Sequence, residues 1–173
     1  EALEDAFYTP MEFGTAGMRG LIGAGINRMN IYTVRQATEG LARFMDTLDE
    51  ETKLRGVAIS YDSRHMSQEF AFEAARVLGA HGIPSFVFES LRPTPELSFT
   101  VRHLHAYAGI MITASHNPKQ YNGYKIYGED GAQMPPKESD MITNYIREVD
   151  DLFAVEVADK DALINDNTLQ VIG

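Results

Sequence analysis

The chain has 173 residues, no cysteine and a net charge of −10, and 44% of its residues are hydrophobic. This composition is sufficient for a folded core, and the length predicts one domain. The lack of cysteine excludes disulfide frameworks and thiolate metal sites, and the negative charge argues against nucleic acid or anionic membranes as partners. No apolar run reaches membrane-spanning length and no basic leader opens the chain, so we expect a cytoplasmic protein.

A glycine-rich segment lies near the start of the chain. Residues 13–30 contain five glycines, which are too many for a helix and predict a loop with an irregular hairpin. Gly23 and Gly25 do not complete a dinucleotide-binding pattern, because position 28 is an arginine. Apolar residues at helical spacing from Val34 to Leu48 then predict an amphipathic helix.

Predicted strands and helices alternate along the rest of the chain. The first three strands are residues 56–61, 85–89 and 110–113. The helices between them are expected to be capped by Ser67 and by Thr94, and another helix opens at Pro136. This alternation predicts an α/β fold of three layers, helix–sheet–helix, around a mixed, mostly parallel sheet of about four strands.

The fourth predicted strand, residues 124–133, follows the third without a helix between them. A parallel crossover needs such a connection, so this strand is expected to run antiparallel and to make the sheet mixed. Residues 1–157 are predicted to form one domain. Residues 158–173 are acidic and lack aromatic side chains, which predicts a linker or the start of a further domain.

The connection between the third and fourth strands carries several reactive side chains. Ser115, His116 and Asn117 follow the third strand, and Lys125 lies in the fourth. Ligands of open α/β sheets bind at strand ends, which makes this connection the candidate site. A plain polar turn has the same composition and remains an alternative. A serine hydrolase is disfavoured, because adjacent side chains in an extended chain point to opposite faces and His116 could not activate Ser115 directly.

Two windows of the sequence contain no carboxylate. Residues 13–38 and residues 97–128 each hold three arginines or lysines and no aspartate or glutamate. If the two windows meet in the fold, they form a positive cleft on an acidic body, which attracts small anions and repels large polyanions. Chance segregation of charge is the alternative.

The same windows hold two long motifs, Phe13-Gly-Thr-Ala-Gly-Met-Arg-Gly20 and Thr113-Ala-Ser-His-Asn-Pro-Lys-Gln-Tyr-Asn-Gly-Tyr-Lys-Ile-Tyr127. They resemble the N-terminal signature and the phosphoserine loop of the α-D-phosphohexomutases, the phosphoglucomutase/phosphomannomutase family. The resemblance runs from about Phe13 to about Asp151 and covers the first domain of that family.

The resemblance implies a mutase that moves phosphate between C1 and C6 of a hexose through a bisphosphorylated intermediate. Ser115 would carry the phosphate, with His116 and Lys125 in proton transfer. Arg19 would act in catalysis as a phosphate clamp, and Asn117 and Lys125 would help to bind phosphate or substrate. Without the motifs, Lys125 reads as an exposed strand lysine, Arg19 as a surface ion-pair partner and His116 as a turn residue.

The resemblance also implies cofactors and partners. Mg²⁺ would bind through the phosphate on Ser115, the one ligand in this chain, and hexose 1,6-bisphosphate would be the activator. The family's aspartate-rich magnesium loop and its sugar-recognition loops are absent from the sequence. The expected partners are a small sugar phosphate and the missing C-terminal domains of the same chain, and this stretch alone is expected to be inactive. A non-catalytic phosphosugar-binding domain and a phosphopentomutase-type member remain alternatives.

Overall fold

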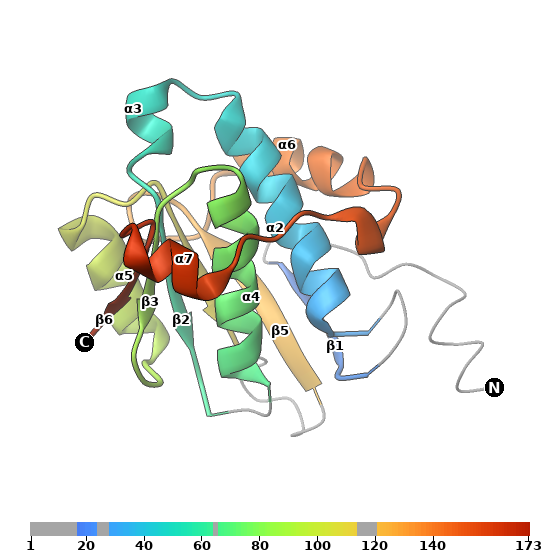
Figure 1. The fold of residues 1–173 in the computed structure, drawn as a ribbon, viewed down its shortest axis with the longest axis horizontal. Helices are drawn as coiled ribbons and strands as arrows, with labels where there is room; N and C mark the ends of the chain where they lie inside the picture. The colour runs from blue at the N-terminus through green and yellow to red at the C-terminus, as the bar shows by residue number, and fades with distance from the viewer. Residues whose placement is uncertain (1–16, 24–27, 64–65, 114–120) are drawn as a thin grey trace.

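A six-stranded sheet forms the centre of the computed structural model, which describes residues 17–23, 28–63, 66–113 and 121–173 (Figure 1). The strands lie in the order β1-β5-β4-β2-β3-β6. Their bounds are Met18–Leu21 (β1), Val57–Tyr61 (β2), Ser85–Phe88 (β3), Ala108–Ile112 (β4), Tyr121–Tyr127 (β5) and Leu169–Ile172 (β6). β4, β2, β3 and β6 are paired in parallel, whereas β5 is antiparallel to both of its neighbours, β4 and β1. The sheet is therefore mixed and mostly parallel, as the alternation of elements predicts.

Helices cover both faces of this sheet and give the expected three layers. They are α2 (Ile31–Asp46), α3 (Glu50–Lys53), α4 (Ser67–Ala80), α5 (Thr94–His103), α6 (Pro136–Arg147), α7 (Lys160–Asn165) and the short 3-10 helix η1 (Leu152–Ala154). In Figure 1, α2, α4 and α7 lie on the side of the sheet that faces the viewer. α5 packs on β2 and β4 with a separate, smaller apolar core.

The larger core lies between the sheet and helices α2, α4 and α6. The apolar stripe of α2, which includes Val34, Leu41 and Met45, is fully buried there, as its helical spacing predicts. Ile112 of β4 and Tyr124 of β5 point into the same core and are also fully buried. These two residues stand opposite each other across the strand pair, so the core directly supports the strands that flank the candidate site.

The sheet has two strands more than the sequence predicts. β1 lies inside the glycine-rich segment, where short length and glycine content hide the strand signal. β6 lies inside residues 158–173, for which the sequence predicts a linker or a new domain. These residues instead form α7 and a sixth strand, and Leu169 to Ile172 pair in parallel with Ser85 to Phe88. The last segment of the chain is therefore part of the same sheet.

Two helix starts differ from the prediction by one residue. Ser67 is the first residue of α4 rather than its cap, and the cap position is held by Met66 in a left-handed conformation with φ 67°. Thr94 is likewise the first residue of α5, after Pro93. The predicted strand 124–133 is also shifted, because β5 ends at Tyr127. The hydroxyl group of Ser67 is thus available for a contact other than capping.

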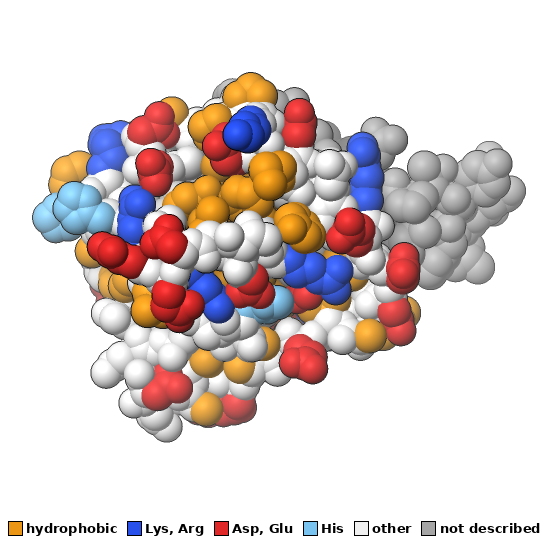
Figure 2. All heavy atoms as spheres, turned by 90° about the horizontal axis from the view of Figure 1, so that it is seen from above, with side chains coloured by type: hydrophobic (Ala, Val, Ile, Leu, Met, Phe, Trp, Pro, Cys, Tyr) orange, Lys and Arg blue, Asp and Glu red, His pale blue; other side chains and the backbone are white. Residues whose placement is uncertain are grey.

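The surface carries the acidic excess of the composition. On the face shown in Figure 2, aspartate and glutamate side chains are interspersed with lysines and arginines. No helix among the described ranges has the length and apolar character that crossing a membrane requires.

Candidate functional site

Strand pairing brings the two sequence motifs together. β1 pairs with β5 so that Met18 stands opposite Tyr124 and Arg19 opposite Gly123. The carbonyl oxygen of Gly123 in turn accepts a hydrogen bond of 3.0 Å from the backbone N–H of Thr113, just after β4. Arg19, Gly123 and Thr113 therefore form one row across three adjacent backbones. This row lies at the edge of the sheet where β4 ends and β5 begins.

The structure tests the placement of only some of the predicted site residues. Ser115, His116 and Asn117 lie outside the described residues, which stop at Thr113 and resume at Tyr121. For Arg19 the backbone position in β1 is described. Lys125 is partly buried in β5, opposite Met111 of β4. Arg19 and Lys125 thus lie on two directly paired strands, whereas the serine, histidine and asparagine remain predictions from sequence.

A chain of hydrogen bonds joins both sides of the segment 114–120 to the body of the domain. Thr113 Oγ1 donates to Asp62 Oδ2. Ser67 Oγ donates to Asp62 Oδ1 over 2.9 Å, and Asn122 Nδ2 donates to Ser67 Oγ over 2.9 Å. Asn122 Oδ1 accepts from its neighbour, the backbone N–H of Gly123, over 2.8 Å. We call Asp62, Ser67, Thr113 and Asn122 the anchor network.

The backbone puts these four side chains in one place. Asp62 follows β2, and its N–H donates to the carbonyl of Ile112 over 3.2 Å, which continues the β2–β4 ladder and sets Asp62 beside Thr113. The chain then turns back into α4, which begins with Ser67. Sequence reasoning missed the roles of Ser67 and Asn122. Ser67 reads as a helix cap and Asn122 only as part of the second motif, and no spacing rule relates two residues 55 positions apart.

One cation of the carboxylate-free windows is already paired. Arg35 Nε lies 2.6 Å from Glu73 Oε1 of α4, and both side chains are largely buried. This pair joins α2 to α4, and Glu73 also pairs with Arg76 of α4 over 3.0 Å. The sequence counted Arg35 toward a positive cleft, and the structure corrects this by assigning it to helix packing.

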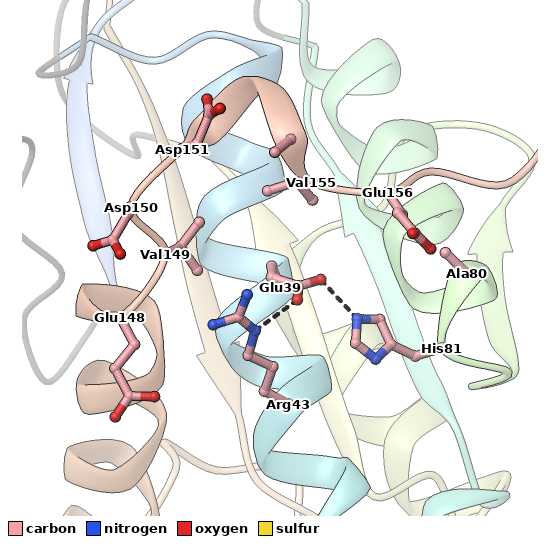
Figure 3. A pocket seen from close by; sticks show the side chains of 11 residues that line it. Glu39, Arg43, Ala80, His81, Glu148, Val149, Asp150, Asp151, Val155 and Glu156 are labelled. Carbon is pink, nitrogen blue, oxygen red and sulfur yellow. Dashed lines mark hydrogen bonds and ion pairs between the residues drawn. The ribbon is translucent and has the colours of Figure 1, made fainter.

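A hollow of about 550 Å³ lies elsewhere, over α2, the end of α4 and the segment after α6 (Figure 3). His81 and Glu39 meet in it, with 2.6 Å between His81 Nε2 and Glu39 Oε1. His81 Nδ1 also lies 2.7 Å from Asp46 Oδ2. α4 separates this hollow from the anchor network, since Ser67 opens the helix and His81 follows its end about 20 Å away. The hollow is therefore not part of the candidate site.

The described residues contain no group of three histidine, aspartate or glutamate side chains placed to hold a metal ion. Magnesium prefers oxygen ligands in near-octahedral geometry.

Comparison with known sequences identifies the domain. The family model "Phosphoglucomutase/phosphomannomutase, alpha/beta/alpha domain I" matches residues 10–152. The phosphoglucomutase of Staphylococcus aureus (strain bovine RF122 / ET3-1) is 46% identical over 153 residues, which are 88% of this chain and 27% of that protein. The phosphoglucomutase of strain USA300 shares the same identity and coverage. The chain thus spans about a quarter of the length of these curated relatives.

Solved structures show the same fold. A protein of Thermus thermophilus named as a phosphomannomutase superposes with a TM-score of 0.71 at 29% identity, over 94% of this chain and 32% of that one. Parafusin, a phosphoglucomutase of Paramecium, superposes with a TM-score of 0.61 at 21% identity, over 81% of this chain and 26% of that one, and supports the fold alone. Because the family model matches most of the sequence and its three-layer architecture is the one observed, the chain belongs to the phosphoglucomutase/phosphomannomutase family and corresponds to its alpha/beta/alpha domain I.

Proposed function

We propose that this chain is the phosphate-carrying domain of a phosphosugar mutase, with Ser115 as the carrier. The observation that carries the proposal is the pairing of β1 with β5, which brings Met18 to Gly20 of the first motif beside Asn122 to Tyr124 of the second. Phosphoryl transfer depends on positioning and on positive charge more than on covalent chemistry. Arg19 and Lys125 lie on these paired strands, and the second motif also contains Ser115, so the two motifs together supply the serine, arginine and lysine that such a transfer uses.

The proposed reaction is a pair of phosphoryl transfers. A hydroxyl group of the sugar phosphate attacks the phosphorus on phosphorylated Ser115 and passes its proton to Lys125 or His116. The bond between phosphorus and Ser115 Oγ breaks as the bond to the sugar oxygen forms, and the Ser115 oxygen takes up the proton, which it gives back when the second phosphate returns. The bisphosphorylated sugar then reorients, and its other phosphate returns to Ser115 Oγ. Arg19 would stabilise the charge on the transferred phosphate with its planar guanidinium group.

Glucose phosphates are the first substrates to test. The support is the 46% identity to proteins named phosphoglucomutase in Staphylococcus aureus. Mannose and pentose phosphates are the comparison substrates, since one of the superposed structures carries the name phosphomannomutase. Because the chain spans 27% of the Staphylococcus aureus protein, we propose that turnover needs the remaining domains and that these 173 residues alone are inactive.

Magnesium and hexose 1,6-bisphosphate belong to the same proposal as requirements of the full-length enzyme. The described residues do not form a site for the metal, so its remaining ligands would come from other domains. The expected result is that a chelator stops turnover and added Mg²⁺ restores it. Hexose 1,6-bisphosphate is expected to restore turnover to enzyme that has lost the phosphate from Ser115.

The decisive experiment uses a full-length polypeptide that carries this sequence. Conversion of glucose 1-phosphate is measured with Mg²⁺ and glucose 1,6-bisphosphate, and tandem mass spectrometry locates the phosphate. We expect phosphate on Ser115 and loss of turnover to background in Ser115→Ala, because no carrier remains. Ser98→Ala, on helix α5 and outside both motifs, is the matched control and should keep full activity.

Two outcomes would reject the proposal. Turnover that survives Ser115→Ala would exclude Ser115 as carrier, as would phosphate found repeatedly on Thr113 and never on Ser115. Binding of glucose 6-phosphate by the full-length protein without any turnover would favour the alternative of a non-catalytic phosphosugar-binding domain.

A further inference from the structure

We propose that Ser67 and Asn122 are positioning residues, which act through the two ends of the segment 114–120 to hold Ser115 for phosphate transfer. The inference rests on the proposed function of Ser115. It adds two residues that lie outside the loop, one of them in a different secondary-structure element, and that would not touch the substrate.

The donor and the acceptor of each hydrogen bond between Asp62, Ser67 and Asn122 are fixed by their chemistry. A serine hydroxyl has a single proton, and Ser67 Oγ donates it to Asp62 Oδ1. Ser67 Oγ can therefore only accept in its contact with Asn122, whose Nδ2 is a donor. The amide of Asn122 cannot be turned over, because its Oδ1 accepts from the N–H of Gly123. Ser67 therefore accepts from Asn122 and donates to Asp62, and neither side chain can exchange its role as donor or acceptor in these contacts.

Both ends of the segment depend on the same connection between β2 and α4. Thr113, just before the segment, bonds to Asp62, and Asn122, just after it, bonds to Ser67. The pairing of β4 with β5 and the backbone bond between Thr113 and Gly123 hold the two ends beside each other. Asp62 and Ser67, which bond to each other, add a side-chain anchor on each side of the segment.

Ser67 and Asn122 are buried, so the loss of a hydrogen bond between them is not compensated by solvent. The exposed fraction of Asn122 is 0% and that of Ser67 is 1%, so water cannot readily replace a lost partner. A buried polar group left without its partner costs free energy, and a satisfied buried network holds its segments rigidly, so breaking it loosens the backbone that it holds. In phosphoryl transfer, a shift of about 1 Å in a reacting group is enough to slow the reaction about 100-fold.

The test uses a full-length polypeptide that carries this sequence, in three variants. Ser67→Ala removes the junction of the network, and Asn122→Asp places an oxygen without a proton against Ser67 at almost unchanged size. Thr38→Val is the matched control, because Thr38 is equally buried and bonds to Tyr124 of the same strand over 2.9 Å, outside the anchor network. The readouts are the rate of Ser115 phosphorylation by glucose 1,6-bisphosphate, kcat and KM for glucose 1-phosphate, and deuterium uptake of the peptide spanning residues 113–122.

We expect Ser67→Ala and Asn122→Asp to slow phosphorylation of Ser115 and lower kcat by about 10- to 100-fold, with KM changed by less than about 3-fold. Deuterium uptake of residues 113–122 should rise in both variants. Thr38→Val should keep kcat within about 3-fold of the wild type and leave that uptake unchanged.

Unchanged uptake in the two network variants would overturn the inference, whatever the turnover. An equal loss of kcat in Thr38→Val would also overturn it, because the effect would then reflect lower stability rather than position. If uptake rises as expected while wild-type Ser115 accepts no phosphate, the anchoring of the loop stands and it is the proposed function that fails.

Discussion

Gly17 lies directly against the backbone of Tyr124, so that a β-carbon built on Gly17 would be 1.9 Å from the Tyr124 carbonyl oxygen. Its φ of 119° is also a value that other residues rarely adopt. Gly123 on the next strand is also close to a neighbouring backbone: a β-carbon built there would lie 2.7 Å from the carbonyl oxygen of Thr113. Glycines in the two motifs therefore allow the three backbones of the row to approach one another.

Gly17→Ala is expected to lower the free energy of unfolding by about 2–3 kcal/mol, because backbone strain and a collision with Tyr124 add together. Urea denaturation followed by circular dichroism measures this. Gly82→Ala is the control, since Gly82 also has a positive φ of 74° but has no atom within 4 Å of the new β-carbon. Gly82→Ala should lower the free energy of unfolding by only about 1–2 kcal/mol, the cost of backbone strain alone. Equal losses in the two variants would show that β1 can move away without cost.

Ile112→Ala is expected to cost about 2–5 kcal/mol, because Ile112 is fully buried in the larger core and its truncation leaves a cavity. Ile112→Val removes a single methylene group and should cost only about 0.5–1.5 kcal/mol. Chemical denaturation of both variants gives the two values. A loss below about 1 kcal/mol for Ile112→Ala would mean that the core refills the space and that β4 is less rigidly held than its burial indicates.

The bond between Tyr124 and Thr38 is suited to a double-mutant cycle. The Tyr124 hydroxyl oxygen lies 2.9 Å from Thr38 Oγ1 in the buried core, and burial raises the pKa of Tyr124 well above its ordinary value. The phenol therefore stays neutral throughout the accessible pH range. Denaturation of Tyr124→Phe, Thr38→Val and the double variant should give a coupling of about 0.5–1.5 kcal/mol. A coupling of zero would show that the two hydroxyl groups stabilise the fold independently.

His81 gives the stability of the chain a dependence on pH. Its hydrogen bond to Glu39 raises the pKa of His81 above the ordinary 6.5; burial opposes this, and the bond to Asp46 adds to it. Because the pKa of His81 is higher in the folded state than in the unfolded state, protonated His81 stabilises the fold. This contribution to the free energy of unfolding is complete below about pH 6.5 and is lost as the pH rises through the raised pKa. Arg43 and Lys53 also face this cluster, with Arg43 Nε 2.7 Å from Glu39 Oε2 and Lys53 Nζ 2.9 Å from Asp46 Oδ1.

We therefore expect the urea midpoint to fall as the pH rises above about 6.5, in a step that His81→Gln lacks. His103→Gln, at an exposed position of α5, is the control and should keep the step. If His81→Gln retains the full pH dependence, another group is responsible.

Local patterns predict most elements of this fold. The apolar stripe of α2 and the apolar runs of β2 and β4 each lie within one segment, and the antiparallel direction of β5 follows from the missing crossover helix. β1 and β6 are different, because each is a four-residue edge strand whose pairing depends on a partner distant in sequence. The same distance hides the bond between Ser67 and Asn122. Sequence motifs indicate which residues belong to the site, but hydrogen bonds between separate segments become visible only in three dimensions.

The pairing of β1 with β5 also has a consequence for synthesis of the protein. Met18 leaves the ribosome roughly a hundred residues before its partner Tyr124. At about 5–20 residues per second, β1 waits on the order of 5–20 s without the one strand it pairs with. The parallel strands β2, β3 and β4 can assemble with their helices earlier, since their contacts are closer in sequence. The edge that brings the two motifs together is thus completed late, and a nascent chain interrupted before residue 121 cannot form it.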